Sequence, residues 1–352
     1  MANIKPFKAY RPTRDKVHLV ASRSYISYTK ADLIRKLDEN PFTFLHILNP
    51  NYKTEEQSFS NSKEKFERVK TKFIDFANEQ ILIQDKKESF YVYRQIKDGH
   101  PYLGIIACAS VKDYYSNVIK KHEATLTKRE GIFKKYLETV QINAEPVCFT
   151  YPNHAKIDRL TNEKILERPE YDFTSTNRDR HTFWKIEDES RVAKLTAYFG
   201  QIDSIYIADG HHRSASSALL GKSLREEQGN PSEEKPYDYF MGYFIPENCL
   251  KIYEFNRLVT TLGDHNVSSF LDAIKENFEI TYVDGDFFRP EKIHEIGMYI
   301  DNKWYCLIPK KGQFLQDDPV KSLDVSILTN HLLAPILGIS DLKTDNRVDF
   351  KG

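Results

Sequence analysis

Apolar side chains recur at helical spacing in several stretches of this chain. One stretch has four of them three or four positions apart, with lysine and glutamate between: Phe66, Val69, Phe73 and Phe76. This is the pattern of an amphipathic helix with one buried face. We expect Ser60 or Asn61 to cap its N-terminus, since a short polar side chain can accept from the free N–H groups there. Similar reasoning predicts helices over residues 29–38, 113–121, 128–141, 190–201 and 213–226.

Runs of β-branched and aromatic residues predict strands. Residues 90–96 and 103–111 form two such runs, and Asp98-Gly99 between them favours a hairpin turn because both residues tolerate positive φ. Further strands are expected over residues 147–151, 181–186 and 204–208. The short apolar patches at 17–20 and 42–48 are expected to be strands or short turns, and residues 155–180 a polar, turn-rich connection.

The last third of the chain is predicted to form a separate, smaller α+β unit after a polar loop at 227–236. The predicted elements are a hairpin of strands 239–245 and 250–259, a helix at 267–277, strands 278–283 and 298–309 (the latter folded at 301–303), and a helix at 323–337. We therefore expect domains over 1–236 and 237–352. The fold class is α/β to α+β, with mixed sheets and packed helices. The extended, glycine-ending terminus suggests that the second domain is truncated.

The predicted strand 204–208 leads directly into Asp209-Gly210-His211-His212-Arg213-Ser214 and a small-residue helix. A helix N-terminus has free backbone N–H groups and a favourable dipole for anions. Gly210 leaves room for close approach, and the histidines and Arg213 add donors suited to phosphate. We interpret residues 209–214 as a nucleotide or phosphate site. A capped polar turn is the alternative.

A second polar group surrounds His122 and Glu123, with Thr125, Lys128 and Arg129 as accessory candidates. By itself it could be a solvated helix end. Together with a phosphate-binding turn, however, Glu123 could accept a hydroxyl proton, which completes the residues that phosphoryl transfer needs. One reaction requires both groups, so the Glu123 carboxylate should open onto the same cleft as His211, His212 and Arg213, within about 10 Å of them.

Composition limits the partners. Lysine plus arginine and aspartate plus glutamate both number 51 in 352 residues, so the net charge is zero and no nucleic-acid or membrane surface is expected. No apolar run reaches a membrane-spanning length and the N-terminal residues lack the apolar core of a signal peptide, which favours a cytoplasmic protein. Cys108, Cys148, Cys249 and Cys306 are widely spaced, as expected of buried, reduced thiols. The oligomeric state is left open.

A metal site held by the protein is not expected. His211 and His212 are adjacent, and adjacent side chains in an extended segment point in opposite directions. The spaced histidine or cysteine pairs typical of zinc sites are missing from the sequence.

The two polar motifs also carry a resemblance. Ile207-Ala208-Asp209-Gly210-His211-His212-Arg213 and His122-Glu123-x-Thr125, with Lys128 following, resemble motifs of the SerK-like free-serine kinase family, otherwise described as a domain of unknown function. Weaker likenesses run in the same order along the chain, at residues 4–7, at Asn256-Arg257-Leu258-Val259 and at 323–338.

This resemblance implies a ParB/sulfiredoxin-like nucleotide-binding core and phosphorylation of free L-serine to O-phospho-L-serine, using ATP or ADP with Mg²⁺. It implies that residues 209–213 bind the nucleotide phosphates and that Glu123 is the base, with His122 beside it and Arg257 as a further accessory residue. Where sulfiredoxins have a cysteine nucleophile, this chain has His211, which disfavours their reductase activity. A nucleotide-binding regulator without turnover and a purely structural turn are the alternatives.

Overall fold

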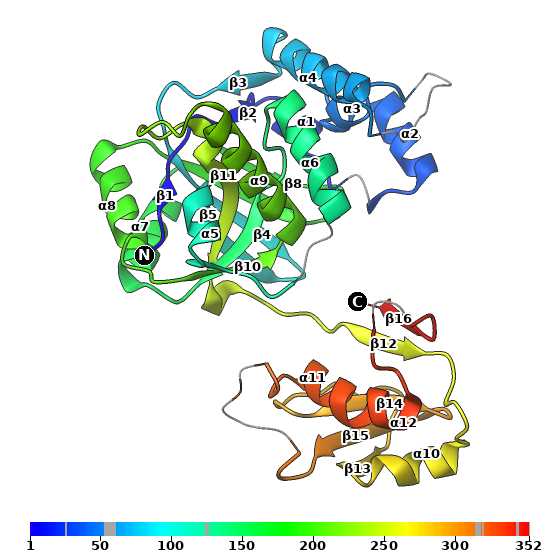
Figure 1. The fold of residues 1–352 in the computed structure, drawn as a ribbon. Coiled ribbons are helices and arrows are strands. Elements are labelled where there is room, and N and C mark those ends of the chain that lie inside the picture. Colours follow the sequence, from blue (N-terminus) through cyan, green and yellow to red (C-terminus); the bar gives the residue numbers. More distant parts are fainter. Residues whose placement is uncertain are drawn as a thin grey trace. The chain divides into compact units, whose positions relative to one another are not determined.

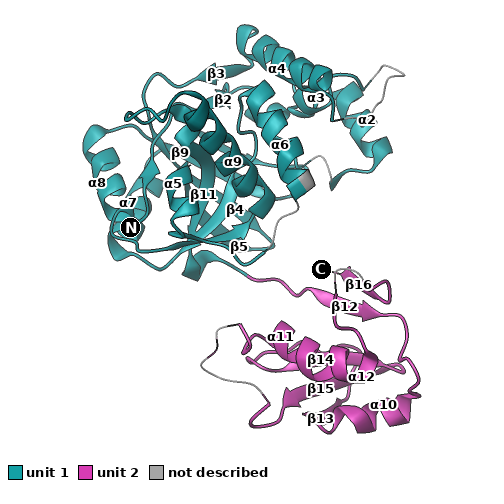
Figure 2. Ribbon diagram, viewed as in Figure 1, with its two compact units in different colours: residues 1–251 teal, residues 252–352 magenta. Residues whose placement is uncertain are grey.

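The chain forms two compact units, residues 1–251 and 252–352, in the computed structural model (Figure 2). The structure describes residues 1–24, 27–52, 61–123, 127–313, 318, 320–342 and 345–351. Because the first unit extends to residue 251, the predicted boundary at 236/237 is misplaced. The reason is that the strand β11 (Tyr239–Pro246) pairs with two strands of the first unit, so its backbone is part of that unit's sheet.

A mixed sheet organises the first unit, with strand order β6-β10-β7-β11-β5-β4-β9-β8 and β1 paired to β5 (Figure 1). Its other strands are β1 (Ile4–Lys5), β4 (Phe90–Lys97), β5 (His100–Ser110), β6 (Ile119–Lys120), β7 (Val147–Tyr151), β8 (Tyr171–Thr174), β9 (Arg180–Ile186) and β10 (Ile205–Asp209). A separate two-stranded pair consists of β2 (Tyr10–Pro12) and β3 (Leu82–Gln84). Mixed sheets with packed helices confirm the predicted fold class.

Two pairings in this sheet are parallel, β6 with β10 and β7 with β11. The others are antiparallel, including the predicted β4–β5 hairpin. Its turn has Asp98 at φ +50° and Gly99 at φ +76°, as the Asp-Gly pair required.

The helices of the first unit follow. They are α1 (Val17–Val20), α2 (Lys30–Glu39), α3 (Leu45–Leu48), α4 (Lys63–Asn78), α5 (Val111–Tyr115), α6 (Thr127–Val140), α7 (Ala155–Ile165), α8 (Glu189–Phe199), α9 (His211–Glu227) and the 3-10 turns η2 (Pro236–Asp238) and η3 (Glu247–Cys249). Figure 1 shows α9 in front of the sheet, beside α6. The cap of α4 is Ser62, whose side chain accepts from the N–H of Lys65, rather than Ser60 or Asn61.

Several sequence predictions were wrong in the first unit. The patches at 17–20 and 42–48 contain short helices, because pairs such as Val17 and Val20 bury one face at helical spacing. Residues 155–165 form a helix rather than a turn-rich connection, with Ile157, Leu160 and Thr161 buried at helical spacing. The helix predicted over 113–121 ends at Tyr115. Ile119 beyond it is fully buried as a strand residue.

The central helix α9 is buried through small residues rather than large apolar ones. Ser214, Ala215, Ser216, Ser217, Ala218 and Gly221 are all buried. Such side chains let a helix approach its neighbours closely, and α9 contacts α5, α6, β7 and β11. A Cβ on Gly221 would lie 2.4 Å from the Tyr237 carbonyl oxygen, so this approach requires glycine. The start of α9 is thus held at one place on the sheet.

The second unit has its own core. Its strands are β12 (Asn256–Val259), β13 (Phe278–Val283), β14 (Ile296–Ile300), β15 (Lys303–Pro309) and β16 (Val348–Lys351), and its helices are α10 (Val267–Ile274), α11 (Asp324–Leu328), a π-helical turn η4 (Thr329–Leu333) and α12 (Ala334–Leu337). The predicted turn at 301–303 is confirmed, with Asp301 and Asn302 at positive φ. The predicted 239–245/250–259 hairpin is wrong, because β12 pairs with β16 while β11 belongs to the other unit.

A proline follows the π-helical turn, at the second position of α12. Pro335 has no N–H, so it cannot donate to the carbonyl of His331 one helical turn earlier. The side chain of Asn277 donates to that carbonyl instead, at 2.8 Å. A side chain from outside the helix therefore satisfies the group that proline leaves free.

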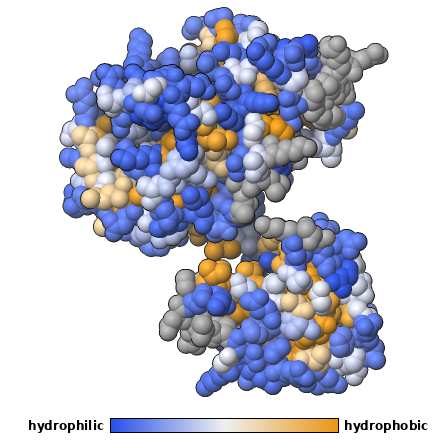
Figure 3. Space-filling view, in the orientation of Figure 1, coloured by the Kyte–Doolittle hydropathy of each residue, from blue (hydrophilic) through white to orange (hydrophobic). Residues whose placement is uncertain are grey.

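Figure 3 shows a largely hydrophilic surface, with hydrophobic side chains gathered on the visible face of the second unit. Ile252, Phe287 and Ile293 of that unit are each more than two thirds exposed. No helix among the described residues combines the length and the apolarity that a bilayer span requires. The four cysteines are half-buried and free, and burial raises the pKa of Cys108 to about 12 and that of Cys148 to about 11.

Candidate functional site

The predicted strand-turn-helix at residues 209–214 is present. β10 ends at Asp209, Gly210 follows at φ +102°, and α9 begins at His211. The helix has no side-chain N-cap and no acidic residue in its first turn. Its first backbone N–H groups are therefore not neutralised locally by a carboxylate of that turn, which favours an anion at this end.

Gly210 is required for the conformation of this turn. Its φ lies in the region that side chains rarely adopt, and a Cβ there would come within 3.1 Å of the Arg213 guanidinium. The Arg213 guanidinium thus lies close to the space that a side chain at position 210 would need.

Arg213 is held by protein groups. It donates to the Asp209 carboxylate at 2.5 Å and to the Pro146 carbonyl at 2.6 Å, and it lies 3.6 Å from a carboxylate oxygen of Glu145. No sequence motif indicated Pro146 and Glu145, which precede β7, as partners of Arg213. These contacts fix the guanidinium beside the α9 N-terminus, and a bound phosphate would share it with two carboxylates.

The hydroxyls of two serines in the first turns of α9 donate to backbone carbonyls of the same turns. Ser214 is fully buried and donates to the Gly210 carbonyl at 3.2 Å, while Ser216 donates to the His212 carbonyl at 2.7 Å. This back-bonding pairs buried hydroxyls within the helix. Ser214, predicted as a phosphate contact, therefore acts on the turn itself in this structure.

His122 and Glu123 reach this turn because β6 and β10 are parallel. Ile119 pairs with Ile205, and Lys120 with Tyr206. Parallel strands end at the same edge of a sheet, so the residues that follow both strands meet there. The motif thus follows the strand β6 and not the end of a helix, which is where the predicted helix over 113–121 would place it.

Three side chains then come together. Nδ1 of His211 lies 3.5 Å from Oε2 of Glu123, and the backbone N–H of His122 is 3.4 Å from Nε2 of His211. The two imidazole rings meet edge to face, with centroids 4.4 Å apart. One ring nitrogen of each histidine and one Glu123 oxygen all lie within 4.8 Å of one another. The prediction that Glu123 lies within about 10 Å of His211 is confirmed.

We call His122, Glu123 and His211 the His-Glu cluster. Its members differ in their exposure to solvent. The His211 side chain is 4 % exposed and that of Glu123 is 61 % exposed. Burial, followed by the nearby His122, lowers the pKa of His211, although the charges of Glu123 and Asp209 act in the opposite direction. His211 is therefore a neutral, fixed imidazole that faces a solvent-accessible carboxylate.

The remaining predicted residues lie outside the His-Glu cluster. His212 is half-buried, and its Nδ1 atom is buried without a hydrogen-bond partner among the described residues. Arg129 is exposed in the first turn of α6. Thr125 lies outside the described residues, as does the side chain of Lys128. Arg257 belongs to the second unit, where its guanidinium lies over the Phe255 and Phe350 rings.

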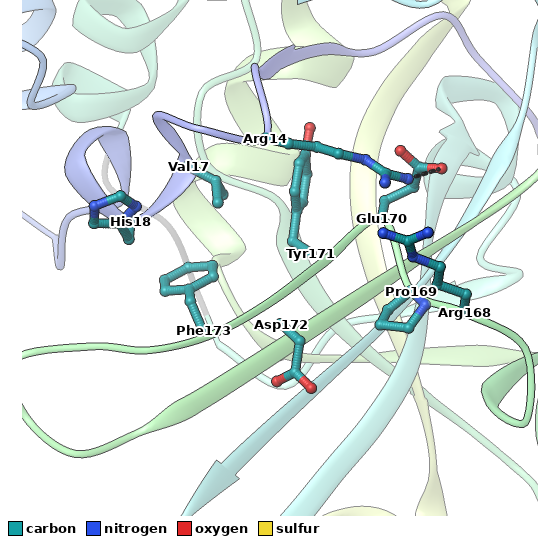
Figure 4. A pocket seen from close by; sticks show the side chains of 9 residues that line it. All are labelled: Arg14, Val17, His18, Arg168, Pro169, Glu170, Tyr171, Asp172 and Phe173. Atoms are coloured by element: carbon teal, nitrogen blue, oxygen red, sulfur yellow. Dashed lines mark ion pairs between the residues drawn. The ribbon is translucent and has the colours of Figure 1, made fainter.

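A cavity of about 380 Å³ lies elsewhere in the first unit (Figure 4). It is lined by Arg14, Val17, His18 and residues 168–173, so it adjoins β8, at the end of the sheet opposite to β10 and β6. The Arg14 guanidinium there is paired with Glu170 at 3.3 Å. The cavity is therefore separate from the His-Glu cluster and from the α9 N-terminus.

Comparison with known proteins places the chain in a family. Residues 4–326 match a family model described as a protein of unknown function, DUF1015. The chain belongs to this family. No curated protein and no solved structure matches it. The family description names no activity, so the function has to be argued from the residues of the site.

Proposed function

We propose that the protein is a small-molecule kinase that transfers a phosphate from ATP or ADP to the hydroxyl of free L-serine or a similar metabolite. The observation that carries this proposal is the Glu123 carboxylate 3.5 Å from His211, the first residue of α9. A candidate base thus lies beside a candidate phosphate site. The resemblance of both motifs to the SerK-like family supports serine as the acceptor, and a ParB/sulfiredoxin-like core stays a prediction.

The residues divide the chemistry between them. The first N–H groups of α9, with His212 and Arg213, would hold the terminal phosphates. Glu123 would accept the proton of the acceptor hydroxyl while that oxygen attacks the terminal phosphorus. The bond from phosphorus to the leaving phosphate oxygen breaks in the same step. The products are O-phospho-L-serine and a nucleotide that is one phosphate shorter.

Mg²⁺ fits this scheme as part of the bound nucleotide. The His-Glu cluster offers two imidazoles and one carboxylate, and Asp209 is paired with Arg213. Mg²⁺ prefers oxygen ligands and commonly takes them from substrate phosphates. It would neutralise phosphate charge there, while the chain's own residues position the reactants.

A phosphorus NMR assay tests the proposal. The full chain would be incubated with Mg²⁺, ATP or ADP, and single hydroxyl-bearing amino acids, including L-serine, L-threonine and L-homoserine. A phosphomonoester resonance that depends on acceptor and nucleotide is the expected result. Nucleotide binding by calorimetry without any phosphomonoester would instead favour a nucleotide-binding regulator. No nucleotide binding would leave the 209–213 turn as a structural feature.

A further inference from the structure

The His-Glu cluster has the geometry of a metal-ligand set. Its three candidate ligand atoms lie within 4.8 Å of one another, and the His211 and Glu123 atoms are 3.5 Å apart. Ligand atoms on a tetrahedral ion with bonds of about 2.0–2.1 Å lie roughly 3.3–3.4 Å apart. Nδ1 of His211 and Oε2 of Glu123 are therefore already at a suitable spacing, whereas the exposed His122 ring has to approach them. Ligation through Nδ1 leaves the ring proton on Nε2, so the 3.4 Å contact from the His122 N–H to Nε2 has to open when the ion binds.

The ligand types indicate which ions would bind. Two imidazole nitrogens and one carboxylate oxygen suit first-row transition metals, whereas Mg²⁺ and Ca²⁺ prefer all-oxygen sets. The carboxylates of Glu123 and Asp209 both favour positive charge at His211, although Asp209 is also paired with Arg213. The positive end of the α9 dipole opposes a cation, but it is weak compared with three direct ligand bonds.

We propose that His122, Glu123 and His211 bind one divalent first-row transition-metal ion, with Zn²⁺ as the expected ion. Three protein ligands leave one coordination position open to water or to an oxygen of a bound molecule, as in catalytic rather than structural zinc sites. His211 is the rigid ligand, because it is buried at the start of α9, and the exposed Glu123 adjusts to the ion. This inference does not rest on the proposed kinase activity.

Metal binding would affect that activity if the protein is a kinase. A Glu123 carboxylate that coordinates an ion is a weaker proton acceptor. Zn²⁺ would therefore lower turnover without preventing nucleotide binding. The site would then make phosphoryl transfer sensitive to transition metals.

Binding is tested on the full chain after removal of metal by a chelator. Co²⁺ is titrated first, because four- or five-coordinate Co²⁺ absorbs visible light more strongly than hydrated Co²⁺, and Zn²⁺ is then added as competitor. The expected result is one equivalent of Co²⁺, displaced by one equivalent of Zn²⁺ and not by excess Mg²⁺. His122→Ala and Glu123→Gln should each weaken binding at least about tenfold, since even indirect partners of a metal contribute that much.

His212→Gln is the matched control and should leave the Co²⁺ spectrum unchanged. His122 and Glu123 are exposed, so their variants decide the test even if His211→Ala fails to fold. Equal Co²⁺ affinity in wild type and in both exposed variants would overturn the proposal. Efficient displacement by Mg²⁺ would also do so. An intense near-ultraviolet thiolate band would indicate Cys148, which pairs with Asp209 in the sheet, and would overturn the ligand assignment.

Discussion

The backbone N–H of His122 points to Nε2 of His211 at 3.4 Å, although the two residues are 89 positions apart in sequence. When Nε2 accepts this hydrogen bond, the neutral ring carries its proton on Nδ1, the atom that faces Glu123 at 3.5 Å. In the metal-free protein His211 therefore acts as a link between the backbone after β6 and the carboxylate, and it holds Glu123 beside the α9 N-terminus.

Glu123→Gln tests the base. The change preserves size and hydrogen bonding but removes the proton-accepting carboxylate, so we expect turnover to fall by about 10²–10⁴-fold with nucleotide affinity retained. The measurement is the rate of phosphomonoester formation alongside calorimetric nucleotide binding. Glu138→Gln, on the exposed side of α6, is the control and should keep full activity. Full activity of the Glu123 variant would mean that another residue is the base.

Gly210→Ala tests the turn. The new Cβ meets a backbone at φ +102° and lies 3.1 Å from the Arg213 guanidinium. We expect the free energy of unfolding to fall by about 1–3 kcal/mol, together with loss of nucleotide binding as Arg213 shifts. Gly229→Ala is a matched comparison, because Gly229 also has positive φ but its Cβ would meet nothing within 4 Å. Similar nucleotide affinity in both variants would argue against a role for this turn in phosphate binding.

Arg213→Ala should weaken nucleotide binding by about 1.5–3 kcal/mol, the scale of a lost charged hydrogen bond. Arg213→Lys should not restore it, because one ammonium cannot reach the Asp209 carboxylate and the Pro146 carbonyl in the same fork geometry. Calorimetric titration with ATP and ADP measures both variants, and a thermal melt separates lost affinity from lost stability. Unchanged affinity in Arg213→Ala would remove this residue from the phosphate site.

Asp85 should make stability depend on acid pH. It accepts from Arg11 at 2.8 Å and from Tyr91 at 2.9 Å, with its side chain only 4 % exposed. Burial alone would raise the pKa of Asp85, but these hydrogen bonds and the Arg11 charge outweigh it, so the folded pKa is lowered. A depressed pKa stabilises the fold above the unfolded value of about 3.9, and this contribution is lost as pH falls through the folded pKa.

Asp85→Asn should therefore cost about 3 kcal/mol near pH 7, the low end for breaking a buried ion pair, and progressively less below about pH 4. Urea unfolding at a series of pH values measures the difference. Asp15→Asn, in an exposed pair with Lys16, should change stability far less at any pH. A cost for Asp85→Asn that does not shrink in acid would contradict this account.

Asn277→Ala should destabilise the second unit by about 1 kcal/mol, because the His331 carbonyl loses its donor. In a Pro335→Ala background the helix can supply its own N–H, so the same change should cost less. A double-mutant cycle by chemical denaturation measures this coupling. Equal costs in the two backgrounds would show that Asn277 does not compensate for the proline.

The sequence determined local structure wherever one short stretch contained the whole signal. The Asp98-Gly99 hairpin, the α4 helix with its buried Phe66, Val69 and Phe76, and the turn at Asp301 and Asn302 all depend on neighbours a few positions away. The strand-turn-helix at Gly210 was predictable for the same reason, because glycine flexibility and free N–H groups are local properties.

Tertiary structure decided which distant residues meet. The two-residue strand β6 is too short to show a periodicity, so the pairing of Ile119 with Ile205 cannot be read from sequence, yet it brings Glu123 to His211. The pairing of β12 with β16 depends on a similar long-range contact. The sequence by itself identified Glu123 and the 209–213 turn as candidate site residues, because their residue types indicate the chemistry that they can perform. Only folding decided the distance between Glu123 and His211, the burial of His211 and the approach of the three candidate ligand atoms. These depend on how strands pack and not on spacing along the chain.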